Sequence, residues 1–181
     1  MLKRWKKLGQ TVRFVNPWWT YKVDTFQIPD GVSGEYHFVY TRGSSAVVPV
    51  TAAGKILLVK QYRYLCDRES LEFPCGSINE GSDHKETAHH ELAEEAGFEA
   101  GTLVDVGHFN PYNGVTSEIC HVYVGSDLTP TEAKPDLTEE FEIHQYSIHE
   151  VDALIRENTI WDGMTLAAWM LARPRVLALL G

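Results

Sequence analysis

Three glutamates, Glu91, Glu94 and Glu95, stand within five consecutive residues. On a helix, where successive residues are about 100° apart, Glu91 and Glu95 share one face and Glu94 lies just beside them. Like charges at this spacing destabilise an isolated helix by roughly a few tenths of a kcal/mol per pair. One interpretation is an acidic face in contact with water. The other is a site for a divalent cation, which takes carboxylate oxygens as ligands.

The segment that carries these glutamates has the signals of a helix over 83–96. Asp83 and Glu86 have the spacing of a capping box at its start. Gly97 follows at the position where glycine commonly ends a helix. The last two glutamates therefore lie near the C-terminal end, where the helix dipole disfavours anions. Local helix energetics does not account for them, whereas a bound cation would.

The composition limits the partners of the chain. Its 181 residues predict a single domain over 1–181, since domains commonly contain about 100 to 200 residues. The 16 Lys and Arg against 25 Asp and Glu leave a net charge of −9, which disfavours a nucleic-acid partner. A small phosphorylated substrate is compatible with this charge, because a metal ion can supply positive charge locally.

Cysteine usage and hydropathy indicate a cytoplasmic protein with no membrane partner. The three cysteines, Cys66, Cys75 and Cys120, are odd in number and lack metal-ligand spacing, so they predict neither a disulfide framework nor a structural zinc site. The basic start, MLKRWKKLGQ, is followed by no apolar run of signal-peptide length. The sequence has no stretch of about 18 apolar residues, the length needed to span a bilayer.

The remaining pattern mixes strands with helices and predicts an α/β fold. After a basic lead-in, 20–28 and 35–41 read as an N-terminal hairpin around the turn residues Pro29, Asp30 and Gly31. Helices are expected over 149–157 and 163–172, with Pro174 bounding the second. A loop is expected over 129–140. Further strands are expected at 45–50, 55–63, 102–109, 118–125 and 141–148, and the second of these is apolar on both faces, as a central strand should be.

Residues 76–98, GSINEGSDHKETAHHELAEEAGF, resemble the Nudix box, a loop–helix–loop signature. Two of its defined positions differ here: Ser82 stands where a Glu belongs and His90 where an Arg belongs. The other seven match, namely Gly76, Glu91, Leu92, Glu94, Glu95, Gly97 and Phe98.

The flanking segments resemble one branch of that superfamily, the ADP-ribose and nucleoside-diphosphate-sugar pyrophosphatases. They are KQYRY (60–64), LEFPCG (71–76), HFNPYNGVTSE (108–118) and LTEEFEIHQYSIHEV (137–151). The resemblance implies an α/β/α sandwich around a mixed sheet. It also implies a homodimer in which strands within 1–44 contribute to the partner's site. The implied reaction is metal-dependent hydrolysis of a nucleotide-sugar substrate to a nucleoside monophosphate and a sugar phosphate.

The same resemblance implies a metal site for Mg²⁺ or Mn²⁺. Glu91 and Glu95 are the leading ligands. Glu94 is a third ligand and belongs to the predicted catalytic set, and the backbone carbonyl of Cys75 is a fourth ligand. Such an ion neutralises pyrophosphate oxygens and lowers the pKa of an attacking water.

A loop glutamate would act as the base that activates water. Glu139 is the first choice and Glu140 the second, and the alternative for both is a solvated acidic loop. Glu118 would orient a water or the substrate; its alternative is a surface strand residue.

Substrate binding is assigned to an arginine and two tryptophans. Arg63 would contact phosphate with its fork of donors, together with Glu72, and the alternative is a salt bridge between the two. Trp5 and Trp19 would stack on the base, and packing is the alternative for both. His84, His89, His90 and His121 show no ligand-like grouping.

The two departures from the Nudix box concern residues that would support the metal ligands. An Arg at the position of His90 would orient a ligating carboxylate, so His90 predicts a higher metal demand and a pH dependence near neutrality. Ser82 is expected to serve as a loop or N-cap residue. Two other functions stay open: hydrolysis of a nucleoside triphosphate or dinucleoside polyphosphate, and nucleotide-sugar binding with impaired turnover.

Overall fold

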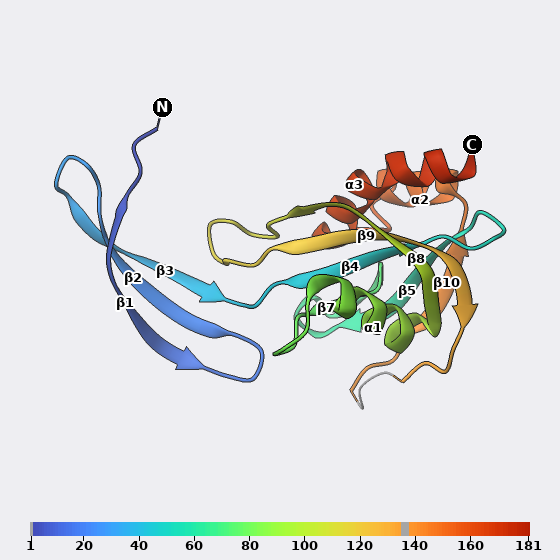
Figure 1. Ribbon diagram of the computed structural model, residues 1–181, viewed down its shortest axis with the longest axis horizontal. Helices are drawn as coiled ribbons and strands as arrows, with labels where there is room; N and C mark the ends of the chain where they lie inside the picture. Colours follow the sequence, from blue (N-terminus) through green and yellow to red (C-terminus); the bar gives the residue numbers. More distant parts are fainter. Residues whose placement is uncertain (1, 135–137) are drawn as a thin grey trace. The chain divides into compact units, whose positions relative to one another are not determined.

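The computed structural model describes residues 2–134 and 138–181 (Figure 1). The chain divides into two compact units. The first comprises Met1–Gly43 and Asn110–Ile119, and the second comprises Ser44–Phe109 and Cys120–Gly181. Part of the loop predicted over 129–140, namely 135–137, lies outside the described residues.

The first unit is built on a three-stranded antiparallel sheet, ordered β1-β2-β3, drawn in blue in Figure 1. Its strands are β1 (Lys6–Val15), β2 (Thr20–Gln27) and β3 (Ser33–Tyr40). The predicted hairpin is confirmed as β2 and β3, joined by a turn in which Gly31 has a φ of 90°.

No strand was predicted in the basic lead-in before residue 20, yet β1 lies there and pairs with β2 along its whole length. Nearly all side chains of β1 are exposed. A strand without a buried face leaves no alternation of apolar and polar residues, which is the pattern that would reveal it.

Two sheets form the centre of the second unit. The order of the first is β7-β4-β9-β8, in which β4 and β9 are parallel and the other pairs antiparallel. The order of the second is β10-β5-β6, with all pairs antiparallel and the predicted central strand β5 in the middle. The strands are β4 (Ser44–Pro49), β5 (Ile56–Arg63), β6 (Arg68–Glu72), β7 (Cys75–Ser77), β8 (Phe98–Phe109), β9 (Cys120–Pro130) and β10 (Glu142–Tyr146), and a short 3-10 helix, η1 (Tyr64–Cys66), joins β5 to β6.

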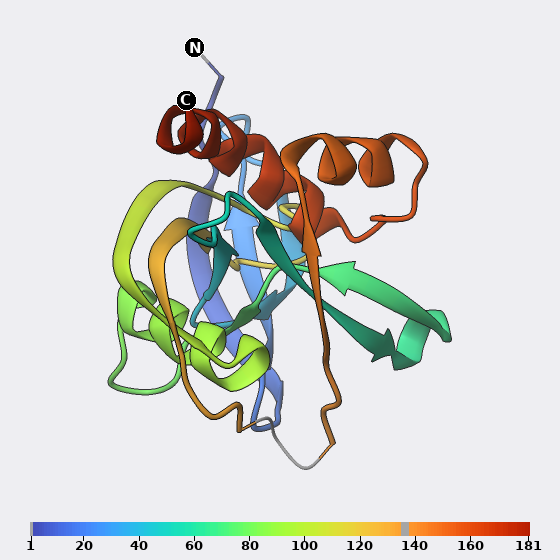
Figure 2. The same ribbon diagram turned by 90° about the vertical axis from the view of Figure 1, so that its right-hand side faces the viewer.

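Helices cover both faces of this central layer. On β4, Val47 packs into a cluster with Ala88, Leu92 and Ala96 of α1 (His84–Ala96). The next residue, Val48, points to the opposite face and packs into a cluster with residues of α2 (Ile148–Arg156) and α3 (Gly163–Leu180). Figure 2 shows the strands of this unit between α1 on one side and α2 with α3 on the other. The predicted α/β/α sandwich around a mixed sheet is therefore confirmed.

The ends of α1 are confirmed, and the end of α3 is not. Asp83 accepts a bond from the N–H of Glu86 at 2.8 Å, the reciprocal bond is 3.1 Å, and Gly97 has a left-handed φ of 69°. Pro174 was expected to bound the last helix but lies inside α3. Ala172 and Val176, on either side, are fully buried, so packing on the sheet outweighs the lost backbone bond.

Helix α3 is apolar, yet it is a helix of the sandwich. By length and composition alone it could cross a membrane, with 18 residues and a mean hydropathy of 1.2. Two arginines, Arg173 and Arg175, interrupt its apolar residues. Its buried side chains, Thr165, Ala168, Trp169, Ala172 and Val176, lie on the side that packs against the rest of the unit.

Candidate active site

Helix α1 holds two carboxylates against strand β7. The side chain of Glu95 is buried, and its Oε2 accepts a hydrogen bond from the backbone N–H of Cys75 at 3.1 Å. The Glu91 carboxylate lies against the Cα of Gly76, since a Cβ on that glycine would stand 2.0 Å from Glu91 Oε1. Glu91 and Glu95 thus meet the same short strand from one helix face, as their spacing predicts.

Burial and like charge disfavour ionisation of this pair. Burial, together with the charges of Glu91 and Glu139, raises the pKa of Glu95 to about 9, against the opposing effects of the Cys75 N–H and Arg63. A divalent cation between the two carboxylates would relieve the repulsion and the lost hydration. Mg²⁺ takes few carboxylates and keeps several waters, so two adjacent glutamates fit such an ion.

Cys75 faces this pair through its backbone. A hydrogen bond with Cys120, together with burial, raises the pKa of the Cys75 thiol well above its usual range. The thiol therefore stays protonated at neutral pH and supplies no anionic sulfur ligand. The role of the Cys75 carbonyl as a ligand stays a prediction.

Arg63 and Glu72 form an ion pair beside the carboxylates. Arg63 Nε donates to Glu72 Oε1 at 2.8 Å, and Nη2 donates to Oε2. The Glu72 side chain is 4% exposed, whereas that of Arg63 is 47% exposed. Hydrogen bonding to Glu72 raises the pKa of Arg63, so the guanidinium is permanently charged. The alternative of a salt bridge between Arg63 and Glu72 is confirmed, and it leaves about half of the arginine side chain exposed.

The two candidate bases, Glu139 and Glu140, lie in different surroundings. Both are exposed and precede β10. The charge of Glu139 is close enough to the buried Glu95 to raise the pKa of that carboxyl. Glu140 lines a separate groove of about 220 Å³ with Lys60, Gln61, Tyr62, Glu69 and Glu142.

Comparisons with known proteins identify the family. A NUDIX domain model matches residues 40–169. The chain is 31% identical over 148 residues to an ADP-ribose pyrophosphatase of Bacillus subtilis (strain 168), which covers 81% of this chain and 80% of the relative. The chain belongs to the Nudix family. It is also 31% identical, over the same shares, to a methanol dehydrogenase activator of Bacillus methanolicus. A crystal structure of an ADP compounds hydrolase shares the fold, with a TM-score of 0.84 at 21% identity over 98% of this chain and 97% of that one.

Of the two departures from the Nudix box, Ser82 is a turn residue. Its N–H donates to the Asn79 carbonyl at 3.2 Å, and its side chain is exposed. The N-cap of α1 is Asp83, so the loop role expected for Ser82 is confirmed and the N-cap role is wrong.

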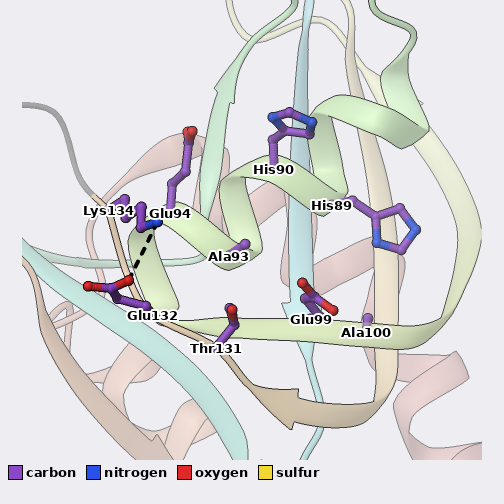
Figure 3. A pocket seen from close by; sticks show the side chains of 9 residues that line it. All are labelled: His89, His90, Ala93, Glu94, Glu99, Ala100, Thr131, Glu132 and Lys134. Carbon is purple, nitrogen blue, oxygen red and sulfur yellow. Dashed lines mark ion pairs between the residues drawn. The ribbon is translucent and has the colours of Figure 1, made fainter.

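His90 and Glu94, also in the Nudix box, lie on a different face of α1 from the buried Glu95. Both are exposed and line a pocket of about 620 Å³, in which Glu132 and Lys134 form an ion pair of 3.5 Å (Figure 3). The roles predicted for Glu94 as a ligand and for His90 as its support stay predictions. The other lining residues are His89, Ala93, Glu99, Ala100 and Thr131.

Three predicted substrate residues, Trp5, Trp19 and Glu118, belong to the first unit. Trp5 stacks on Phe26, with ring centroids 4.4 Å apart, so one face of its indole is already covered. Trp19 lines a pocket of about 240 Å³ that also contains Tyr40 and Arg42. The Glu118 carbonyl accepts a bond of 2.6 Å from Asn110 Nδ2, which fixes the backbone of that loop.

Sequence reasoning missed a stack of histidines in the second unit. The rings of His84 and His121 have centroids 3.8 Å apart, those of His108 and His121 are 5.2 Å apart, and His121 pairs with Asp105 at 3.3 Å. The pairing of β8 with β9 places His108 opposite His121. His84, at the start of α1, is held near them by a bond of 2.7 Å from the hydroxyl of Ser45, which lies opposite His121 on β4. Within 2–134 and 138–181, no group of three or more His, Cys, Asp or Glu has the geometry to hold a metal ion through side chains alone. The Glu91 and Glu95 site would therefore depend on backbone oxygen and water as well.

Replacing Gly76 by Ala tests the close approach of Glu91 to β7. The new Cβ would stand 2.0 Å from Glu91 Oε1, so the carboxylate must leave its place. We expect Mn²⁺ affinity, measured by isothermal titration calorimetry, to fall by about 10-fold or more. The matched control is Gly163→Ala, whose Cβ would meet nothing within 4 Å. Equal Mn²⁺ affinity in the two variants would contradict this geometry.

Replacing Glu95 by Gln tests the cost of burying the carboxyl. The group has a pKa of about 9 when folded, against an ordinary value of 4.5, so folding takes up a proton between these values and stability falls as pH rises. In a chelator at pH 8 we expect the variant to gain on the order of 2 kcal/mol in free energy of unfolding, with no gain near pH 4.5. Glu94→Gln, at an exposed neighbour, should gain nothing. Denaturant titration at both pH values measures the effect, and a destabilised Gln variant would refute it.

Proposed function

We propose that this chain hydrolyses the pyrophosphate bond of a nucleoside diphosphate sugar, ADP-ribose or a close analogue. The observation that carries the proposal is the pair of Glu91 and the buried Glu95 against β7, in a Nudix chain whose relative of similar length is named an ADP-ribose pyrophosphatase. Water adds to one phosphorus, the anhydride P–O bond breaks, and each product keeps one phosphate. The three cysteines, none of which is in a disulfide, support a reducing, cytoplasmic location.

The residues that would hold the metal are Glu91 and Glu95, with Glu94 and the carbonyl of Cys75 as further ligands. When bound, Mg²⁺ or Mn²⁺ supplies charge neutralisation at the pyrophosphate oxygens and a lowered pKa for water. The repulsion between Glu91 and Glu95 supports this assignment, because a cation bound beside them would attract both carboxylates and offset the repulsion.

Glu139 is the proposed base that takes the proton from the attacking water. An exposed carboxylate in electrostatic range of Glu95 can accept a proton there and release it to solvent. Glu140 has charged neighbours of its own in the groove with Lys60 and Glu142. This separation supports Glu139 over Glu140.

The substrate would meet Arg63 with one of its phosphates. The guanidinium is held by Glu72 through two bonds and still exposes 47% of its side chain. Trp19, with Tyr40 and Arg42 around one pocket, offers an aromatic and cationic surface for the nucleotide. Trp5 offers the free face of its ring, and Glu118 would orient a water or the substrate.

We infer that the working form is a homodimer formed through the first unit. A three-stranded sheet with little apolar burial is marginal by itself. The structure leaves large apolar side chains of this unit exposed, among them Leu8, Val12, Phe14, Val15 and Trp18.

Light scattering after size exclusion tests the dimer. We expect a mass of twice the 20.4 kDa of one chain. The double variant Val12→Lys with Phe14→Lys should elute as a monomer, since two buried ammonium groups would be unpaired in the interface. The control is Met170→Lys, at an apolar side chain of the second unit that is 76% exposed. A monomeric wild-type chain would refute the inference.

A substrate panel with matched base variants tests the reaction. ADP-ribose, ADP-glucose, GDP-mannose, dGTP and a dinucleoside tetraphosphate are offered with Mg²⁺ or Mn²⁺, and phosphate is released from the products by a phosphatase. We expect the diphosphate sugars to be hydrolysed, with kcat about 10²–10⁴-fold lower in Glu139→Gln and little changed in Glu140→Gln. Preference for dGTP or the tetraphosphate would select that class of Nudix substrate instead. Tight binding without turnover would select a binding protein.

A further inference from the structure

The hydroxyl of Ser70 is buried beside the Arg63 and Glu72 pair with no bond of its own. Ser70, on β6, is 2% exposed. Across the described part of the chain, its Oγ has no hydrogen-bond partner. A buried hydroxyl is normally paired, because an unpaired one loses its bonds to water and gains nothing. An unpaired one beside a substrate-binding pair therefore requires an explanation.

The pairing of β5 with β6 shows what lies around this hydroxyl. Ser70 is directly opposite Gln61, and Glu72 is directly opposite Val59. Residues two apart on a strand share a face, so Gln61, Arg63, Ser70 and Glu72 all belong to one face of the hairpin. The Glu72 carboxylate accepts a bond from Gln61 Nε2 at 3.5 Å and also bonds Arg63. Since Gln61 lies opposite Ser70, the Glu72 side chain is inclined along β6 towards Ser70.

The resting arrangement presents an energetic problem for substrate binding. Glu72 takes two bonds from Arg63, and its third donor, Gln61, is at the long limit of a hydrogen bond. If the guanidinium turns to a phosphate, it gives up at least part of its bonding to Glu72. A carboxylate that is 4% exposed cannot recover those bonds from water, and an unpaired buried charge is strongly destabilising.

We propose that Ser70 is a positioning residue whose hydroxyl donates a hydrogen bond to the Glu72 carboxylate when Arg63 turns to the phosphate of the substrate. The inference rests on the proposed function for its kinetic consequence. Rotation about one side-chain torsion aims the Ser70 O–H at the carboxylate above it, with no movement of the backbone. Glu72 then keeps a hydrogen-bond donor. Arg63 can therefore bind the phosphate without leaving the buried Glu72 carboxylate unpaired.

A stability cycle without substrate tests the handover itself. Arg63→Met removes the arginine permanently and imitates the state in which it has turned away. Ser70→Ala should leave the melting temperature unchanged or raise it by about 1–3 °C in the wild-type background, because an unpaired hydroxyl is lost. In the Arg63→Met background it should lower the melting temperature by about 3–5 °C, because Glu72 loses its replacement donor. If Arg63→Met does not fold, Arg63→Lys serves as the background, since an ammonium cannot make the two-pronged bond.

The same shift in both backgrounds would overturn the proposal, whatever the substrate is. Kinetics adds an independent readout on the substrate that the panel selects. Ser70→Ala should raise KM about 5–10-fold with kcat within about twofold, and Ser70→Thr, which keeps a hydroxyl, should restore KM. An unchanged KM in Ser70→Ala overturns the role in binding. A chain that hydrolyses no member of the panel refutes the proposed function, and the stability cycle still decides the handover.

Discussion

The contact of helix α1 with strand β7 is the constraint on which the site depends. Ala88, Leu92 and Ala96 anchor the helix in the core, and this places the carboxylates of the same helix against a strand of three residues. Only a residue without a side chain leaves room for Glu91, and Gly76 provides it. Ionisation of both carboxylates, one of them buried, therefore costs stability, and a bound cation would offset that cost.

The ion pair of Arg63 and Glu72 affects the charge of the site. Arg63 is near enough to lower the pKa of Glu95, yet its bonds go to Glu72 and not to the carboxylate pair. The arginine thereby stabilises the anions at a distance and keeps its exposed half for a ligand. Glu72, which is buried on β6, holds the guanidinium of Arg63 in place.

The sequence predicted those parts of the fold that depend on local periodicity. The ends of α1 and the shared face of Glu91 and Glu95 follow from caps and from the helical repeat, and both were correct. Strand β1 was missed because an exposed strand shows no alternation of apolar and polar residues. The end of α3 was placed too early because packing on the sheet outweighs the low helix propensity of Pro174. The register that brings Gln61 opposite Ser70 is a tertiary feature that the spacing of residues in the sequence does not reveal. The same holds for the contact between His84 of α1 and His121 of β9.

The two departures from the Nudix box, Ser82 and His90, both lie at exposed positions. Ser82 lies in an exposed turn where Asp83 already caps the helix, and His90 lies on an exposed face with Glu94. Glu95 is held against β7 by the N–H of Cys75, and Gly76 leaves room for Glu91. A chain that only bound nucleotide sugars would be more stable with a neutral residue at position 95, so a costly buried carboxylate argues for chemistry that needs its charge.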